Sequence, residues 1–415
     1  MQAISGDNNR QLLLALLQAG LDSVAGRNAV KQYFLNSPVD VEQIALVAIG
    51  KASASMAQGV VDIFADKIVS GLIISKSENL DQRLCEVMGL QCIVGAHPVP
   101  DESSLVAGKA LLSYLAGLPD ELPVVFLISG GTSSLLEVLP DNVSLSELQR
   151  INQWLLASGL SIDLMNAVRK AVSVIKAGRL AKYLGHRKTL NLLLSDVPGN
   201  NPADIGSGLL IKNTTDRLLP EPLPPWLSEI IESVALKNEL VEQDFRMIET
   251  VIIGDNQTAC AAVQHYAREM GLAVTLHLQA LSGDAVTMAK HIARVLRDAK
   301  AGVHIWGGET TVQLPDSPGR GGRNQHLALA LALEIQNDPT VTVVAIGTDG
   351  SDGASDDAGA LVDGTTIGKG ELSGLSAVQC LQQANSGEFL EQTGDLINTG
   401  PTGTNVMDLV IACKT

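Results

Sequence analysis

The chain has 415 residues, enough for two domains or one large domain with an ample core. Its 29 Lys and Arg against 45 Asp and Glu give a formal net charge of −16, which argues against a nucleic-acid surface, and the 3% of aromatic residues argues against base-stacking platforms. The apolar runs are too short to cross a bilayer, and the first residues lack the pattern of a secretory signal, so we expect a cytoplasmic protein without a membrane partner.

The five cysteines are scattered, and no two of them form a Cys-x-x-Cys pair. This spacing predicts reduced cysteines that pack in the interior, rather than a disulfide framework or a zinc site. The residues concerned are Cys85, Cys92, Cys260, Cys380 and Cys413.

The first half of the chain repeats one order of elements: a short apolar strand, a turn with glycine or proline, and a helix. Leucines at helical spacing predict a first helix over 9–25. Strands are expected at 44–49, 71–75, 91–95, 124–128 and 190–194, and helices at 52–64 and 166–184. Repeated strand and helix units predict an open α/β sheet, which binds ligands at the carboxyl ends of its strands.

Two of these strand ends carry candidate binding groups. Lys51 follows strand 44–49 among small residues that leave room for a ligand, although a solvated lysine is the alternative. After strand 124–128, Ser129-Gly130-Gly131-Thr132-Ser133 opens a helix, which is typical of a phosphate-binding turn. Gly-Lys-Ser/Thr is absent, so this is not a Walker loop. We interpret the turn as a site for nucleotide phosphates, with a simple capped turn as the alternative.

Two further residues of this half are candidates with open alternatives. His97, in a proline-containing loop, either lines a site or hydrogen-bonds within its turn. Asp196 follows strand 190–194, where a carboxylate can hold magnesium, accept a hydroxyl proton, or cap the turn.

The stretch from Thr215 to Asp244 is rich in proline and then acidic, which predicts a connection between domains. A second α/β series follows it. We therefore expect a first domain at 1–218, a linker at 219–245 and a second domain at 246–415.

The second half contains a glycine loop that joins an acidic turn to a helix. Glu309 ends a strand, glycines at 319, 321 and 322 leave backbone amides open, and a helix begins near Asn324. Such a helix start with Arg323 beside it predicts a clamp for a carboxylate or phosphate, with Arg320 more peripheral. A mobile glycine turn with solvated arginines is the alternative. Asp349, directly after strand 341–346, is a candidate for metal or hydroxyl recognition.

Taken together, these residues favour phosphoryl transfer from a nucleotide to a small acid, because that chemistry needs cationic clamps and magnesium rather than a covalent apparatus. Asp196, Glu309 and Asp349 are the candidate metal ligands, and we expect at least one to contact the ion directly or through water. A dehydrogenase is the main rival, but no strand is followed by Gly-x-Gly-x-x-Gly with an acidic residue about 20 positions later. A non-catalytic module that binds a sugar or acid is the third possibility.

Nine motifs, in order over nearly the whole chain, resemble the class II glycerate 2-kinases. They are Ala48-Ile-Gly-Lys51, Gly95-Ala-His-Pro-Val-Pro-Asp-Glu102, Ser129-Gly-Gly-Thr-Ser-Ser-Leu-Leu136, Asn166-Ala-Val-Arg-Lys170, Ser195-Asp-Val-Pro-Gly199, Gly307-Gly-Glu-Thr-Thr311, Gly319-Arg-Gly-Gly-Arg-Asn-Gln325, Gly347-Thr-Asp-Gly350 and Thr399-Gly-Pro-Thr-Gly-Thr-Asn405.

The resemblance implies a Rossmann-like first domain, a MOFRL-type second domain, and phosphorylation of D-glycerate to 2-phospho-D-glycerate with ATP and Mg²⁺ in the cleft between them. By this resemblance Lys51 and Arg323 stabilise the transferring phosphoryl group. We assign catalysis to Lys51, Arg323 and Asp196, and substrate binding to Lys51, Arg323 and Asn324.

The chain departs from the family pattern at three places. Thr132 stands where the family usually has a third glycine, and it is expected to narrow the turn. Ser77-Glu78 and the segment ending at Leu209 also differ, which bears on substrate choice. Family members have also carried the name hydroxypyruvate reductase, so a reductase that uses NAD(P)H is the alternative activity.

Overall fold

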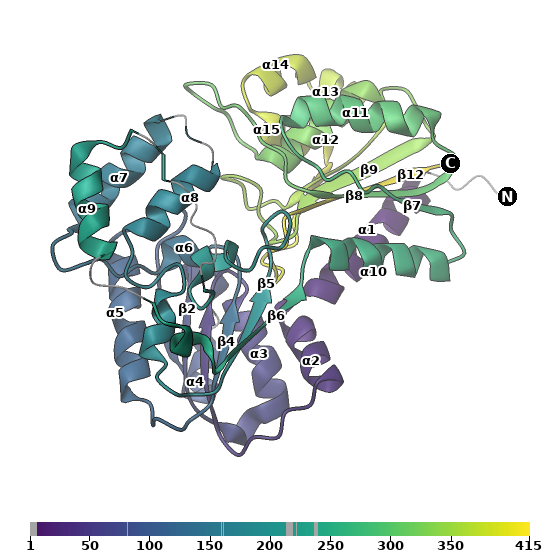
Figure 1. The fold of residues 1–415 in the computed structure, drawn as a ribbon. Helices are drawn as coiled ribbons and strands as arrows, with labels where there is room; N and C mark the ends of the chain where they lie inside the picture. Colours follow the sequence, from purple (N-terminus) through teal and green to yellow (C-terminus); the bar gives the residue numbers. More distant parts are fainter. Residues whose placement is uncertain are drawn as a thin grey trace. The chain divides into compact units, whose positions relative to one another are not determined.

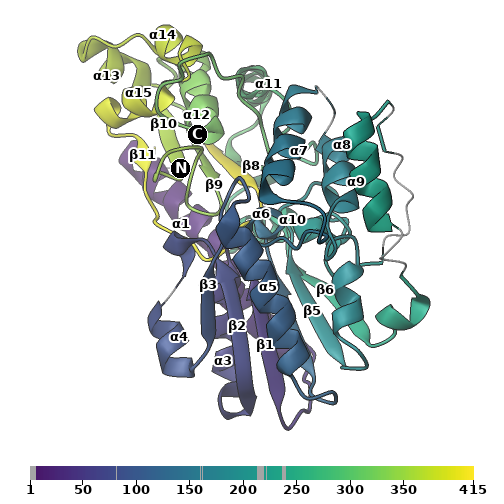
Figure 2. The ribbon, with the colours of Figure 1, turned by 90° about the vertical axis from the view of Figure 1, so that its left-hand side faces the viewer.

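Two six-stranded sheets with helices on their faces make up the part of the chain that the structure describes (Figures 1 and 2). The structure, a computed structural model, describes residues 6–80, 82–158, 160, 162–212, 219–220, 222–235 and 240–415. It confirms the predicted α/β class with two domains. Among the helices in these ranges, none has the length and apolar character needed to cross a membrane.

The first sheet has the strand order β3-β2-β1-β4-β5-β6, which is the order of dinucleotide-binding Rossmann folds. Strands β1 to β5 pair in parallel. The strands are β1 (Ile44–Ile49), β2 (Ile68–Ser75), β3 (Gln91–Val94), β4 (Val124–Ile128), β5 (Thr189–Leu194) and β6 (Ile248–Gly254). The helices of this unit are α2 (Gly26–Asn36), α3 (Ser53–Phe64), α4 (Gln82–Met88), α5 (Glu102–Gly117), α6 (Thr132–Leu135), α7 (Leu145–Ala157), α8 (Ile162–Ala171) and α9 (Pro225–Ala235).

The central strands of this sheet are buried on both faces, as expected for parallel strands covered by helices. Helix α5 covers one face and α2 with α3 covers the other (Figures 1 and 2). On the α5 side, Val47 of β1 and Phe126 of β4 share a core with Leu111. The continuous apolar runs of β1 and β4 therefore follow from their central place, and both strands match the predicted ranges.

The second sheet has the order β11-β10-β9-β12-β8-β7, with antiparallel pairing except between β7 and β8. Its strands are β7 (Val274–Leu276), β8 (Gly302–Gly308), β9 (Val341–Gly347), β10 (Gly359–Asp363), β11 (Leu396–Ile397) and β12 (Asp408–Lys414). Helices α11 and α12 lie on one face, and α1 and α10 on the other (Figure 1). The helices of this unit are α1 (Gly6–Val24), α10 (Asn256–Glu269), α11 (Ala285–Asp298), α12 (Arg323–Glu334), α13 (Thr366–Leu372), α14 (Ala377–Gln382) and α15 (Ser386–Thr393).

The two compact units do not follow the predicted domain limits of 1–218 and 246–415. The first unit is Gly26–Ile253, which contains the first sheet. The second unit combines the segment up to Ala25 with Gly254–Thr415 and contains the second sheet. Helix α1 belongs to the second unit because it packs on α10, and because Arg10 pairs with Asp363 and with the buried Asp395 at 2.7 Å each.

The predicted linker also contains regular structure of the first unit. Helix α9 lies within residues 219–245, and its Leu227 joins a small core with Ile151 of α7 and Val168 of α8. The segment that was expected to open the second domain forms β6, the strand beside β5 in the first sheet. Residues 221 and 236–239 of the predicted linker, and the limit at 218, lie outside the described residues.

The prediction of a single helix over 166–184 is wrong. Helix α8 ends at Ala171, and a short 3-10 helix covers Arg179–Tyr183. Between them Ala177 and Gly178 have φ of 55° and 84°, and their amides donate to carbonyls at 207 and 208. The helix has already ended before them, because the Val174 amide donates to the Val138 carbonyl at 3.0 Å instead of continuing the helical ladder. The left-handed residues then keep the backbone non-helical up to Arg179, although the side-chain spacing alone continues the helix.

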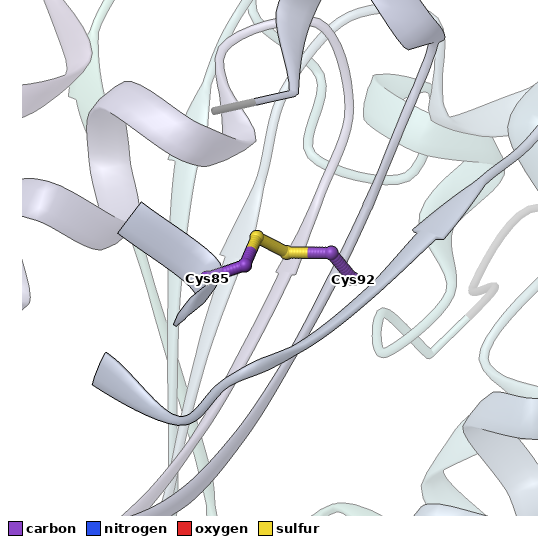
Figure 3. Close-up of a disulfide and its surroundings, with 2 residues drawn as sticks. All are labelled: Cys85 and Cys92. Carbon is purple, nitrogen blue, oxygen red and sulfur yellow. A yellow bond between two sulfur atoms is a disulfide. The ribbon is translucent and has the colours of Figure 1, made fainter. Parts of the chain in front are cut away.

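The prediction of five reduced cysteines is wrong for two of them. Cys85 of α4 and Cys92 of β3 form a disulfide across a Cα–Cα distance of 6.2 Å (Figure 3). Helix α4 turns back along the strand that follows it, which brings two residues seven positions apart within disulfide range. Cys260, Cys380 and Cys413 are free and buried, as predicted.

Candidate active site

The predicted site residues fall into two sets, one in each unit. In the first unit, β1 and β4 are neighbours at the point where the strand order reverses, and ligands bind at this point in open α/β sheets. Lys51 follows β1, and Ser129 follows β4. The backbone amide of Lys51 donates to the Gly130 carbonyl at 2.9 Å, so the structure brings Lys51 and the predicted phosphate turn together.

Gly50 makes this close approach possible. It has a φ of 123°, and a Cβ at this position would lie 2.2 Å from the Ser129 hydroxyl oxygen. That hydroxyl accepts the amide of Ala52 at 3.0 Å. The glycine before Lys51 is therefore required by the contact between the two turns.

The orientation of the peptide groups in the 129–133 turn favours the binding of an anion. The Ser129 carbonyl accepts the Thr132 hydroxyl at 2.7 Å, and the Gly131 carbonyl accepts a hydroxyl from the following residues. Because the carbonyl and amide of one peptide point in opposite directions, carbonyls held inward direct the next amides outward. The amides of Gly130, Gly131, Thr132 and Ser133 donate to no acceptor in the part of the chain that the structure describes. Outward amides of this kind form an anion-binding concavity.

The Thr132 side chain does not narrow this turn in the expected way. It is fully buried, and its hydroxyl also lies 3.1 Å from the carbonyl of Ile49, beneath the turn. His97 lies beside Gly131 of the turn. A Cβ on Gly131 would be 3.1 Å from the His97 ring and 3.2 Å from the Lys51 side chain. The position of His97 therefore favours the interpretation that it lines the site.

Asp196 lies two residues beyond β5, the neighbour of β4. The carboxyl ends of parallel strands meet at one edge of a sheet, so Asp196 is at the same edge as Lys51 and the 129–133 turn. These three features come from three adjacent strands.

In the second unit, Arg323 is the first residue of α12 and forms an ion-pair network. Its Nε and Nη2 donate to Asp408 at 2.7 and 2.8 Å, and its Nη1 lies 2.9 Å from Glu309. These contacts involve three of the five N–H groups of the guanidinium. Arg320, in contrast, has an exposed ion pair with Glu391, in agreement with a peripheral place.

The start of α12 binds an anion, but the anion is the protein's own Asp352. Its carboxylate accepts the amides of Asn324 and Gln325 at 3.0 and 2.7 Å. Gly322 permits this approach, because a Cβ there would lie 2.4 Å from the Asp352 carboxylate. The open amides predicted for this helix start are therefore already paired. Asp352 lies three residues after the candidate Asp349, in the acidic and glycine-rich segment 347–357.

Asp352 and Asp408 were not predicted as functional residues. Both are almost completely buried. Burial raises the pKa of Asp352 to about 7, against the opposing hydrogen bonds from the α12 amides. Burial also raises the pKa of Asp408, and the bonds from Arg323 oppose this shift. The sequence shows Asp408 only as an acidic residue that opens the apolar strand β12.

A pocket of about 400 Å³ lies beside this network within the second unit. Glu309, Arg323, His326 and the glycines of the 319–322 loop line it. Asn324 faces Asp352 through its amide nitrogen at 3.3 Å, and Asp349 accepts the Ser351 amide at 3.1 Å. Of the predicted residues in this unit, Glu309 and Arg323 therefore line the pocket together.

Another pocket, of about 370 Å³, lies at the amino-terminal ends of the strands in the first sheet. Phe34, Phe64 and Met247 line it, and none of the predicted site residues does. The outward amides and Lys51 lie at the other, carboxyl-terminal edge of this sheet.

Each candidate metal ligand could offer magnesium one carboxylate, but the candidates do not form a cluster. Glu309 is paired with Arg323, and Asp349 accepts the amide and the hydroxyl of Ser351. No group of three or more metal-binding side chains occurs among the described residues. Magnesium often takes only one or two protein carboxylates, with phosphate oxygens and water as its other ligands, so the donor set is compatible with a nucleotide-bound ion.

Comparisons with known proteins cover both units. Residues 12–220 match the family described as a domain of unknown function, DUF4147, and residues 302–408 match the MOFRL family. The chain is 32% identical to the D-glycerate 2-kinase of Thermotoga maritima, over 97% of each chain. It is 33% identical to an Agrobacterium vitis protein with the provisional name hydroxypyruvate reductase, over 88% of this chain and 97% of that protein. The crystal structure of a Thermotoga maritima glycerate kinase superposes with a TM-score of 0.82 at 31% identity, covering 99% of this chain and 100% of that one.

Proposed function

Because the chain belongs to the family of DUF4147 and MOFRL proteins that includes the Thermotoga maritima D-glycerate 2-kinase, we propose that it is a glycerate 2-kinase. In the proposed reaction the C2 hydroxyl oxygen of D-glycerate bonds to the γ-phosphorus of ATP, and the bond to the β–γ bridging oxygen breaks. The products are 2-phospho-D-glycerate and ADP, and the hydroxyl proton leaves to a base.

The observation that carries this proposal is the 129–133 turn, with outward amides next to Lys51 at the strand-order reversal. The hydrogen bonds to the carbonyls of the turn fix its peptides, so the amides need no reorganisation to receive phosphate oxygens. Preorganised donors of this kind contribute strongly to transition-state stabilisation. The lysine adds a positive charge to the same place. This arrangement suits the triphosphate of ATP better than a small uncharged ligand.

We assign the remaining roles by residue chemistry. Lys51 and Arg323 neutralise charge on the transferring phosphoryl group and the glycerate carboxylate, and Asn324 hydrogen-bonds the acid. Asp196, at the same sheet edge as Lys51, accepts the hydroxyl proton. For Arg323 this role uses N–H groups beyond the three in contact with Asp408 and Glu309. That the reaction takes place between the domains stays a prediction.

Magnesium bound with ATP neutralises phosphate charge and orients the γ-phosphoryl group. Asp196, Glu309 or Asp349 would hold it through one carboxylate. The Glu309 carboxylate pairs with Arg323 at 2.9 Å, and the Asp349 carboxylate accepts the Ser351 amide at 3.1 Å.

A coupled assay tests the proposal. The purified protein with D-glycerate, ATP and magnesium should form ADP, and it should not oxidise reduced nicotinamide when hydroxypyruvate replaces glycerate. The reductase is disfavoured because β1 is followed by Gly50-Lys51 rather than by Gly-x-Gly-x-x-Gly. Nicotinamide oxidation without ADP formation would refute the kinase, and binding of glycerate without turnover would favour a non-catalytic module.

A further inference from the structure

A buried ion pair lies directly behind the phosphate turn. The Nζ of Lys176 is 2.5 Å from a carboxylate oxygen of Glu137, and the two residues are 2% and 1% exposed. The other carboxylate oxygen accepts the Ser173 hydroxyl at 2.5 Å and the Val138 amide at 3.0 Å. Both charges are therefore well provided with hydrogen-bond partners.

Stability alone does not account for such a pair. The cost of removing two charges from water often equals or exceeds their attraction, and apolar side chains of similar volume are frequently as stable. Lys176 makes a second contact in addition to the ion pair: its Nζ also donates to the Ser133 carbonyl at 2.8 Å. An apolar residue cannot make this bond.

Ser133 is the last residue of the turn whose amides point outward, and its hydroxyl is 2.7 Å from that of Ser207. Lys176 therefore holds the end of the turn by its backbone. Glu137 holds Lys176 in place, since it occupies a second donor of the same ammonium group. The peptide fixed in this way joins Ser133 to Ser134, and its amide donates to the Gly131 carbonyl at 3.2 Å, so the bond from Lys176 also supports the carbonyl that directs the Thr132 amide outward.

We propose that Lys176 is a positioning residue for nucleotide binding, held by Glu137, and that it acts through the Ser133 carbonyl to keep the 129–133 amides aligned with the phosphates of ATP. This inference rests on the proposed function. It assigns the buried pair to ATP affinity and not to recognition of the acid.

The test separates alignment from stability. Lys176→Met leaves Glu137 buried without its cation, so it should lower both the unfolding midpoint and ATP affinity. In Lys176→Met/Glu137→Met both charges are gone, so stability should recover toward wild type. The Ser133 carbonyl still lacks its donor, so the Kd for ATP should stay about tenfold above wild type, as expected for one lost hydrogen bond. The KM for D-glycerate should not change.

Arg10→Met is the matched control, because it removes a cation from the buried Asp395 in the other unit. It should lower stability and leave the ATP Kd unchanged. ATP binding is measured by calorimetry without glycerate, so the readout does not depend on turnover. Recovery of wild-type ATP affinity in the double variant, an equal rise in the glycerate KM, or a wild-type chain that does not bind ATP would each overturn the inference. A wild-type chain that binds ATP but phosphorylates no glycerate would refute the kinase alone.

Discussion

Replacing Arg323 by Lys should destabilise the second unit, because the change breaks a bidentate bond to a buried carboxylate. Asp408 is 1% exposed and accepts two N–H groups from Arg323, and a lysine can satisfy only part of that geometry. One lost charge-assisted bond costs about 1.5–3 kcal/mol. The half-exposed contact with Glu309 adds about 1 kcal/mol at most. The expected loss is therefore about 1.5–4 kcal/mol.

Arg320→Lys is the control from the same loop. Arg320 pairs with Glu391, and both side chains are about half exposed. Exposed ion pairs contribute about 0–1 kcal/mol, so this variant should lose less than about 1 kcal/mol. The two variants make the same chemical change in different surroundings.

Denaturant unfolding followed by Trp306 fluorescence measures this difference. Trp306 is buried in the core of the second unit, whereas Trp154 and Trp226 pack in a cluster of the first. Replacing the latter two by Phe leaves one reporter for the unit that contains Arg323. The assigned catalytic role adds a second expectation: with both variants folded, Arg323→Lys should lose much of kcat/KM and Arg320→Lys little. Equal, small losses in stability and in kcat/KM would refute both the structural and the catalytic reasoning for Arg323.

Three further predictions concern single residues. Lys51→Ala should lower kcat by about two orders of magnitude or more while circular dichroism shows an intact fold, and near-normal turnover would remove Lys51 from the site. Asp196→Asn, Glu309→Gln or Asp349→Asn should raise the magnesium concentration for half-maximal activity in at least one of the three variants; unchanged titrations in all three would count against a metal role. Since the folded pKa of Asp352 is raised to about 7, its stabilising effect is complete below pH of about 4 and is lost as pH rises to about 7. In wild type the unfolding free energy should therefore fall between pH of about 4 and 7, and Asp352→Asn should make this fall shallower by up to about 1.4 kcal/mol per pH unit. If the variant and the wild type show the same dependence of unfolding free energy on pH, the raised pKa of Asp352 is contradicted.

The strand positions and one half of the candidate site could be predicted from sequence. Continuous apolar runs followed by glycine-containing turns identified β1 and β4, because a strand that is buried on both faces has apolar residues at every position. The proximity of Lys51 to the 129–133 turn then followed from the rule for strand ends in parallel sheets. These features are local or governed by a general topological rule.

The interactions missed from the sequence all join distant segments. Asp352 reaches the α12 amides across 28 positions, and Lys176 reaches the Ser133 carbonyl across 43. The sequence shows which groups are charged, but it does not show which of several carboxylates a helix start will bind. The break between α8 and Arg179 was missed because the apolar spacing continues through it, whereas the Val174 amide leaves the helix to bond the distant Val138 carbonyl. The left-handed Gly178 was the local sign of the break in the sequence.

The separation of α1 from the rest of its unit has a consequence for biosynthesis. The ribosome releases α1 before all of Gly26–Ile253, while its partners α10, β9 and β12 come later. The first unit can fold during this time, whereas the leucines of α1 stay exposed to solvent until the rest of the second unit has been synthesised. Strand β12, near the end of the chain, then inserts between β8 and β9, in the interior of its sheet rather than at an edge. A nascent chain that stops short of β12 therefore carries one finished sheet and one that is split in two.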